Sequence, residues 1–248
     1  MDAMQSVLPS YTRFGMSALL PHRKLSMSND YNVLVDGKVC DNLNSREQVL
    51  QSFVPNSRTV QFDDIKTMKI AELKEIFSGQ EVVYVYHNQI DARGDKLNTE
   101  NEVFTACEEA VEEIHTMIKR LTSANNIRFI ITADHGFIYK RDKLVESDKI
   151  SGFERENAFV GRRYVIAPEG IHAEGVGTVR LGNILGNDDD RIVSVPIGSD
   201  VFKVAGGGQN FVHGGSTLQE IVIPVLNVRT SKYHTETKAV SIALVSSV

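Results

Sequence analysis

The spacing of hydrophobic residues changes several times along the chain. Val82–Tyr86 is a run of β-branched and aromatic residues, which is typical of a buried parallel strand. The apolar run Ile127–Ile131 predicts a second strand. Between the two, residues 101–125 have apolar positions at helical spacing, which would form one stripe made of Val103, Phe104, Cys107, Val111, Ile114, Ile118 and Leu121. This βαβ order predicts a parallel sheet in which both strands end on the same side.

Polar and turn-forming residues predict the other elements. Asp36-Gly37 supplies the positive φ angles of a tight hairpin turn within residues 33–40. Capping-box spacing at Ser45/Gln48 and at Thr99/Glu102 predicts two helix starts. Beyond Phe137 the chain becomes a series of short strands separated by turns, which we interpret as an antiparallel extension. Further expected elements are a helix within residues 10–20, helical spacing over 64–77, and strands at 158–160, 164–166, 178–181, 192–195, 221–223 and 239–245.

The composition excludes several classes of protein. With 248 residues, 42% hydrophobic and 24% charged, the chain has the make-up of an ordinary globular enzyme or domain. A net charge of -5 argues against a broad nucleic-acid surface but is compatible with a nucleotide held through metal ions. The two cysteines, Cys40 and Cys107, have no disulfide or metal-ligand spacing, so we expect small buried residues in a reducing compartment. Neither a membrane span nor a signal peptide is found, which predicts a cytoplasmic protein without membrane contact.

Thr132–Gly136 carries the most informative chemistry. The second predicted strand delivers the adjacent Asp134 and His135 into a loop, and ligands bind beyond the carboxyl ends of strands in open α/β sheets. A carboxylate and an imidazole together suit zinc or manganese. The alternative is a solvated loop that happens to contain an Asp-His pair.

Two other segments contain candidate metal ligands. Asp91 and Asp95 follow the strand that ends at Tyr86, close to His87, and a turn that directs two or three of these side chains inward would bind a divalent cation. His213 has glycines on both sides, which allow close approach of the backbone and can aim the imidazole. The alternatives are a hydrophilic loop in the first case and an incidental histidine in the second.

The segment Leu8–Met16 offers a candidate nucleophile. Ser10 and Thr12 lie near the expected start of a helix, where backbone N–H groups and the helix dipole favour negative charge. A metal ion could lower the pKa of such a hydroxyl enough for nucleophilic attack. Alternatively, Ser10 or Thr12 is an ordinary helix N-cap.

In this order along the chain, the four segments resemble the alkaline phosphatase superfamily. Three of their sequences, PSYTRFGMSALLPH, HNQIDARGD and HGGSTLQE, resemble the PglZ family of bacterial BREX phage-defence systems. The resemblance extends from about Leu8 to the end of the chain. The resemblance implies a single PglZ/alkaline-phosphatase-like domain over residues 1–248. Its fold would be an α/β/α sandwich with a mostly parallel sheet and an antiparallel insert at about residues 141–205.

The resemblance also implies roles for the matching residues. Thr12 matches the nucleophile that attacks phosphorus and becomes transiently phosphorylated. Asp134 and His135 match ligands of the metal that activates this nucleophile. His213 and Asp91 match ligands of a second metal.

Other positions depart from the family pattern. Asp95 stands where relatives often have a histidine ligand, which makes His87 a competing candidate. Arg13 or Arg93 would stabilise charge in the transition state. Superfamily members begin with a strand ending in an Asp ligand, and no strand of that kind precedes Thr12. We therefore expect a part of a larger protein, without the first core strand, and less active than a longer chain.

The implied activity is metal-dependent hydrolysis of phosphate esters, by a phosphatase or a phosphodiesterase. Two divalent metal ions, zinc or else manganese, would clamp the nucleophile and the transferring phosphoryl group. The expected partners are a phosphate-ester or nucleotide substrate and other proteins of the defence system. Two alternatives remain: a catalytically silent interaction module of a defence complex, and a phosphomutase, because the same core performs intramolecular phosphoryl transfer.

Overall fold

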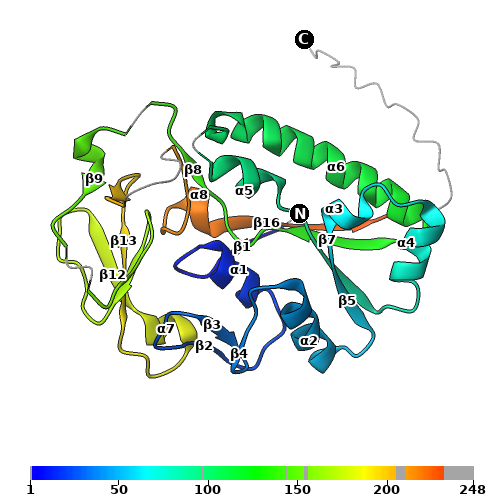
Figure 1. Ribbon diagram of the computed structural model, residues 1–248, viewed down its shortest axis with the longest axis horizontal. Coiled ribbons are helices and arrows are strands. Elements are labelled where there is room, and N and C mark those ends of the chain that lie inside the picture. Colours follow the sequence, from blue (N-terminus) through cyan, green and yellow to red (C-terminus); the bar gives the residue numbers. More distant parts are fainter. Residues whose placement is uncertain (1, 97, 143, 154–155, 205–209, 232–248) are drawn as a thin grey trace, which may run out of the picture.

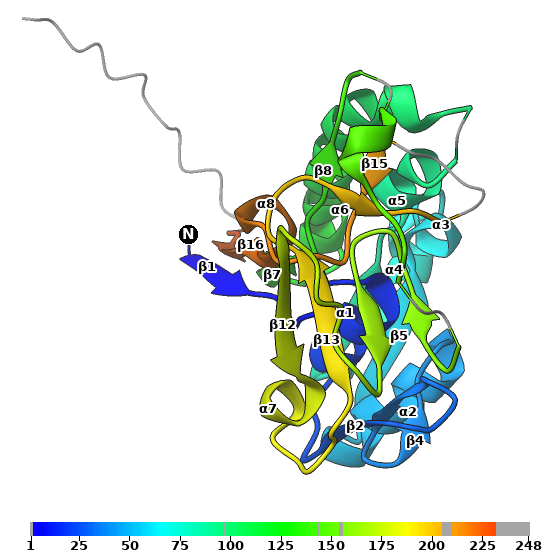
Figure 2. The ribbon, with the colours of Figure 1, turned by 90° about the vertical axis from the view of Figure 1, so that its left-hand side faces the viewer.

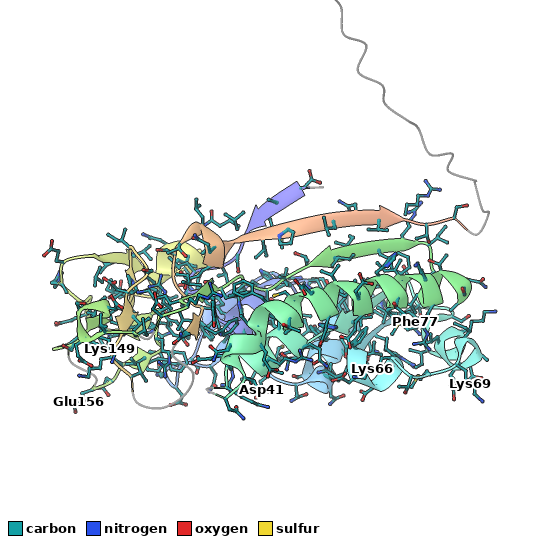
Figure 3. The ribbon with its side chains drawn as sticks, turned by 90° about the horizontal axis from the view of Figure 1, so that it is seen from above. Asp41, Lys66, Lys69, Phe77, Lys149 and Glu156 are labelled. Carbon is teal, nitrogen blue, oxygen red and sulfur yellow. The ribbon has the colours of Figure 1, made fainter. Side chains whose placement is uncertain are left out.

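The computed structural model describes residues 2–96, 98–142, 144–153, 156–204 and 210–231. Helices α5 (Gln89–Gly94) and α6 (Val103–Ser123) run along one edge of the molecule, and a group of short strands forms one end (Figure 1). Toward the other end lie α2 (Leu43–Phe53), α4 (Ile70–Phe77) and β5 (Ser57–Gln61). The labelled residues Lys149 and Phe77 mark these two ends in the view from above (Figure 3). The strand expected at residues 239–245 lies outside the described residues.

The two strands of the expected βαβ unit form as predicted, but they pair with other partners. Strand β6 (Val82–Tyr86) pairs in parallel with β5 (Ser57–Gln61), which the sequence pattern did not reveal. Strand β7 (Arg128–Thr132) pairs antiparallel with β16 (Val222–Arg229). The prediction of one parallel sheet containing both β6 and β7 is therefore wrong in this detail, because strand pairing is decided by contacts between distant segments.

A short strand precedes Thr12. Strand β1 (Asp2–Gln5) pairs antiparallel with β16, so the three-stranded sheet has the order β1-β16-β7. This strand ends at Gln5, and Asp2 at its start is exposed. The expected absence of the first core strand with its Asp ligand stays a prediction.

The long helix α6 (Val103–Ser123) continues the short 3-10 helix η1 (Glu100–Glu102) and runs alongside β7 (Figure 3). Its buried residues are Val103, Ala106, Ala110, Met117 and Leu121. Phe104 and Val111, which we expected in the core stripe, are 56% and 65% exposed. The two alanines let α5 (Gln89–Gly94) and other neighbours approach closely, so the buried face is rotated away from the larger apolar residues.

Two predicted helix starts need correction. Helix α2 (Leu43–Phe53) begins after Asn42, whose side chain accepts from Ser45 N–H in a capping box, so Ser45 is the third helical residue and not the cap. Thr99 does not cap α6, since its Oγ1 donates to Arg93 O at 2.8 Å. The predicted hairpin is confirmed: β3 (Val33–Val35) and β4 (Lys38–Val39) are joined through Asp36 at φ 48° and Gly37 at φ 82°.

The region after Phe137 contains the antiparallel strands that the pattern predicted. Strands β10 (Phe159–Val160), β11 (Val165–Ala167), β13 (Ile192–Pro196) and β12 (Val176–Arg180) form one antiparallel sheet in that order, which faces the viewer in Figure 2. Tyr164, Ile166 and Val193 from this region share a core with Tyr11 and Phe14. The insert, whose boundaries at about residues 141–205 remain a prediction, therefore packs directly on the segment around Thr12.

Two expectations from the composition concern the cysteines and membrane helices. Cys40 is buried as expected, whereas Cys107 is only half-buried. Among the described residues, no helix has both the length and the apolar character that a membrane crossing requires. The elements not yet named are α1 (Thr12–Ala18), β2 (Leu25–Met27), α3 (Phe62–Ile65), β8 (Ile138–Tyr139), η2 (Glu146–Asp148), β9 (Lys149–Ile150), α7 (Leu181–Leu185), β14 (Val201–Phe202), β15 (Phe211–Val212) and α8 (Leu218–Ile221).

Candidate metal centre and nucleophile

Thr12 is the first residue of α1, and its hydroxyl faces two other segments of the chain. Its Oγ1 lies 3.1 Å from His135 Nε2 and 3.4 Å from Asp91 Oδ2. The N-cap of α1 is Tyr11, which makes no side-chain capping bond, and Ser10 Oγ instead donates to Gly215 O at 2.8 Å. The alternative that Ser10 or Thr12 is an ordinary N-cap is therefore wrong.

The ring of His135 is oriented so that one nitrogen can act on Thr12. The residue is buried, and its Nδ1 lies 3.0 Å from Gly136 O. A ring nitrogen that faces a carbonyl oxygen must carry the proton, so the lone pair of the neutral imidazole is on Nε2. The Thr12 hydroxyl can therefore donate its proton to this Nε2.

Two carboxylates converge on the same imidazole. His135 Nε2 lies 3.6 Å from Asp91 Oδ2 and 3.5 Å from Asp134 Oδ2. Asp91 comes from the first turn of α5, just after β6, and Asp134 follows β7. Although β6 and β7 belong to different sheets, the loops that follow them meet, as the sequence predicted. Burial raises the pKa of Asp134 above its usual value, and the His135 imidazole opposes this only in part.

His213 completes the group from the glycine-rich loop. Its ring stacks on His135 with centroids 4.0 Å apart, and its Nε2 lies 3.7 Å from Asp95 Oδ1. Burial lowers the pKa of His213, but the carboxylates of Asp95, Asp91 and Asp134 outweigh burial and hold it above the usual value for histidine. The site thus concentrates negative charge around two imidazoles.

Two atoms in this group that could bind a metal ion have no hydrogen-bond partner. Asp134 Oδ2 and His213 Nδ1 are both buried, and neither makes a hydrogen bond. Such buried polar atoms are costly unless something binds them, and a carboxylate oxygen with an imidazole nitrogen suits zinc or manganese. The residue types therefore fit a divalent cation. Among the described residues, however, no three His, Cys, Asp or Glu side chains stand in a ready-made metal cage.

The other predicted site residues lie at the rim or outside the group. The Asp95 side chain is 58% exposed. His87 points elsewhere, because its Nε2 lies 2.7 Å from Glu113 Oε2 on α6. Arg93 Nη2 donates to Glu109, and Arg13 is exposed beside Thr12. The structure thus brings together Thr12, Asp91, Asp134, His135 and His213.

Glycines allow the site segments to approach one another. A Cβ on Gly15 would lie 2.5 Å from Asp134 O, and a Cβ on Gly136 would lie 2.1 Å from Gln219 O. Real side chains do not reach such distances, so only glycine permits α1 and α8 to contact the loop of Asp134 and His135 this closely.

Several residues that support the site were missed by sequence reasoning. Ser6 Oγ donates to the backbone oxygen of Asp134, and Ser10, which the sequence suggested only as an N-cap, donates to Gly215 O in the glycine loop. Glu220 and Arg163 form a fully buried ion pair next to that loop. The capping-box spacing of Thr217 and Glu220 was a signal that could have directed attention to Glu220, whereas Arg163 carried none.

Comparisons with known proteins agree with this picture. The family model described as the BREX system PglZ alkaline phosphatase-like domain matches residues 1–228. The chain is 39% identical to the alkaline phosphatase-like protein PglZ of Bacillus cereus (strain H3081.97) over 250 residues, which cover 98% of this chain and 29% of that protein. It is 33% identical to the alkaline phosphatase-like protein BrxZ of Escherichia coli O9:H4 (strain HS), with 90% of this chain and 26% of that protein covered. The chain therefore spans under a third of the length of these relatives.

A solved structure shares the fold. The phosphonoacetate hydrolase from Sinorhizobium meliloti 1021, in complex with phosphonoacetate, matches with a TM-score of 0.50 and 11% sequence identity. The match covers 95% of this chain and 83% of that one. At this identity the likeness concerns the fold alone, and it confirms the predicted alkaline-phosphatase-like α/β architecture. Together with the family match over most of its length, these findings show that the chain belongs to the PglZ family of alkaline phosphatase-like domains of BREX systems.

Proposed function

We propose that this chain carries the site of a metal-dependent phosphoric ester hydrolase that acts in phage defence. The observation that carries the proposal is the Thr12 hydroxyl, which lies within 3.4 Å of both His135 Nε2 and Asp91 Oδ2. Beside it, Asp134 and His213 each have a buried donor atom without a partner. This arrangement combines an oriented hydroxyl with unsatisfied ligands for a cation.

The Thr12 hydroxyl would act as the nucleophile. Its oxygen attacks phosphorus, the bond from phosphorus to the leaving oxygen breaks, and the phosphoryl group is transferred to Thr12. Water then hydrolyses the phosphothreonine, which releases phosphate or a phosphate monoester and restores the hydroxyl. Asp91 Oδ2, which accepts the hydrogen bond of the Thr12 hydroxyl, orients that hydroxyl and takes its proton. The exposed Arg13 follows Thr12 directly in the sequence, and its charge would stabilise the transferring phosphoryl group.

Asp134, His135, His213 and Asp91 would hold the divalent ions, with Asp95 at the rim. When bound, such ions supply positive charge that lowers the pKa of the hydroxyl and neutralises phosphoryl oxygens. His135 Nδ1 is turned to the Gly136 carbonyl, which leaves its other nitrogen free of a proton and available as a ligand. The proposal includes zinc or manganese as the metal, a cytoplasmic location, and other defence-system proteins as partners.

The test is hydrolysis of p-nitrophenyl phosphate and bis(p-nitrophenyl) phosphate with zinc or manganese added. It should be run on this chain and on a longer polypeptide of the same family member, since the relatives are more than three times as long. Rapid acid quenching followed by peptide mass spectrometry should find phosphate on Thr12. Hydrolysis that is insensitive to chelators, or phosphate found on another residue, would refute the proposed mechanism.

A catalytically silent interaction module is the second candidate. It is favoured by the lack, within the described residues, of three side chains already arranged as a metal cage. A silent module would bind another defence protein and show no hydrolysis with any divalent metal in either length of chain. The same assay therefore separates the two functions.

A further inference from the structure

A buried ion pair connects the antiparallel region to the loop that carries His213. Arg163 lies between β10 and β11, Glu220 lies in α8, and neither side chain has any exposed surface. Arg163 Nε and Nη2 donate to the two carboxylate oxygens at 2.9 and 2.8 Å. Arg163 Nη1 and Nη2 also donate to the backbone oxygens of Asp200 and Gly198. The guanidinium is therefore held in one geometry by four hydrogen bonds.

A contribution to protein stability does not by itself explain why an ion pair is buried here. Two charges lose their hydration when they are buried, and their attraction often does no more than offset that loss. Apolar residues of similar volume would commonly serve stability as well or better. A role in geometry explains why charged groups occupy this position.

The carboxylate of Glu220 holds the backbone just after His213. Its Oε1 accepts from Gly215 N–H at 2.8 Å, and its Oε2 accepts from the Thr217 hydroxyl at 2.7 Å. A Cβ on Gly215 would lie 2.7 Å from Glu220 Oε2 and 2.8 Å from Arg163 Nη2. The ion pair thus touches the main chain two residues beyond the imidazole, and only glycine fits between.

The backbone around Glu220 also contacts the other site segments. The Glu220 carbonyl accepts from Gly136 N–H at 2.8 Å, directly after His135. Ser10, two residues before Thr12, donates its N–H to Gly214 O at 3.1 Å and its hydroxyl to Gly215 O at 2.8 Å. One small region therefore sets the relative positions of Thr12, His135 and His213.

We propose that Arg163 and Glu220 are positioning residues, whose ion pair fixes the His213 loop against His135 and Thr12. Because Arg163 belongs to the antiparallel region, that region also helps to hold the site residues in position. The inference rests on the proposed function only for its catalytic consequence, because the arrangement of the two imidazoles can be measured without any metal or substrate.

The test uses the stacked rings of His135 and His213 as a reporter. Their centroids are 4.0 Å apart, so each ring should shift the carbon-bound proton resonances of the other in NMR spectra of the metal-free protein. Spectra of the single variants His135→Gln and His213→Gln assign these signals. In the double variant Arg163→Met/Glu220→Leu, apolar groups replace the ion pair, so the protein should fold and melt near the wild-type temperature. We expect the mutual shifts to disappear and zinc affinity to fall at least about tenfold.

Glu220→Gln provides a second variant that keeps the shape and removes the charge. The glutamine amide has one acceptor oxygen where the carboxylate has two, so it cannot accept the hydrogen bonds of Arg163, Gly215 and Thr217 together. We expect its ring shifts to change even if the double variant does not fold. Arg191→Met is the control, because Arg191 bonds Asp189, Met27 O and Ser28 O, and its loss should leave the shifts unchanged.

Wild-type ring shifts and zinc affinity in a folded double variant would overturn the proposal, and so would unchanged shifts in Glu220→Gln. Loss of the shifts in the variants, together with an absence of phosphoesterase activity in the wild-type protein, would support the positioning role and refute the proposed function. The two failures are therefore distinguishable.

Discussion

The imidazole rings of His135 and His213 lie almost parallel, with centroids 4.0 Å apart and planes inclined by 8°. One ring follows β7, and the other comes from the glycine-flanked loop beyond β15. Their stacking places Asp134 and Asp91 beside one imidazole and Asp95 beside the other. This contact therefore joins the two halves of the proposed metal centre.

Substitution of Asp134 or His213, the two proposed metal ligands that have a buried atom without a hydrogen bond, should weaken metal binding. Asp134→Asn and His213→Gln each replace a group with a buried unpaired donor atom, so we expect the Kd for zinc to rise at least about tenfold. Isothermal titration calorimetry of this chain measures the change. His87→Gln is the matched control and should bind zinc like wild type, because His87 is paired with Glu113. If His87→Gln lost zinc while His213→Gln kept it, the ligand assignment would be reversed.

Thr12→Ala should abolish phosphoester hydrolysis while preserving the fold. Loss of the nucleophile removes the covalent route, so we expect a rate decrease on the order of 10³-fold or more. Thr12→Ser is the matched variant: it keeps a hydroxyl near His135 and should retain measurable turnover. The Thr12→Ala protein should melt near the wild-type temperature, because Thr12 makes no N-cap bond. Wild-type turnover by Thr12→Ala would eliminate the nucleophile role.

Local patterns predicted the parts of the site that are local in sequence. Asp134 and His135 were found because they follow an apolar strand directly, and Asp91 was found for the same reason after β6. The hairpin at Asp36-Gly37 formed as expected because two adjacent residues dictate its turn. In each case the deciding interactions lie within a few residues.

Features decided by distant contacts were not predictable in this way. Nothing in the run Val82–Tyr86 indicates that β5 is its partner, and nothing in Arg163 indicates its bond to Glu220. Phe104 and Val111 fit the apolar stripe of α6, but the helix buries Ala106 and Ala110, so they remain exposed. The choice between two faces of a helix depends on its neighbours, which a single periodicity does not contain.

A methyl group at Gly136 should disturb the site through its backbone. A Cβ there would lie 2.1 Å from Gln219 O, so Gly136→Ala must push α8 away from the loop of His135. We expect a loss of about 1–3 kcal/mol in the free energy of unfolding, measured in urea. Gly198→Ala is the control, because a Cβ at Gly198 meets nothing within 4 Å and should change stability by less than about 0.5 kcal/mol. Equal stability of Gly136→Ala and wild type would contradict the close packing of α8.

The buried pair of Arg163 and Glu220 should make part of the protein's stability depend on pH. Burial raises the pKa of Glu220, but the hydrogen bonds and charge of Arg163, with help from Thr217 and Gly215, outweigh burial and hold the pKa below the usual value. A carboxyl whose folded-state pKa is lowered stabilises the protein above its unfolded-state pKa, which is about 4.3 for glutamate. That contribution is lost as the pH falls through the lower, folded-state pKa.

Urea unfolding of wild type and Glu220→Gln across the acid range tests this dependence. At pH 7 the variant should be the less stable of the two, and the difference should shrink as the pH falls below about 4, because the wild-type carboxyl then takes up a proton. Asp63→Asn is the comparison, since the pKa of Asp63 is also lowered, chiefly by its hydrogen bond from Lys66, but the group is exposed and contributes little to stability. If the difference in unfolding free energy between wild type and Glu220→Gln stays constant from pH 7 down through the acid transition, Arg163 does not lower the pKa of Glu220.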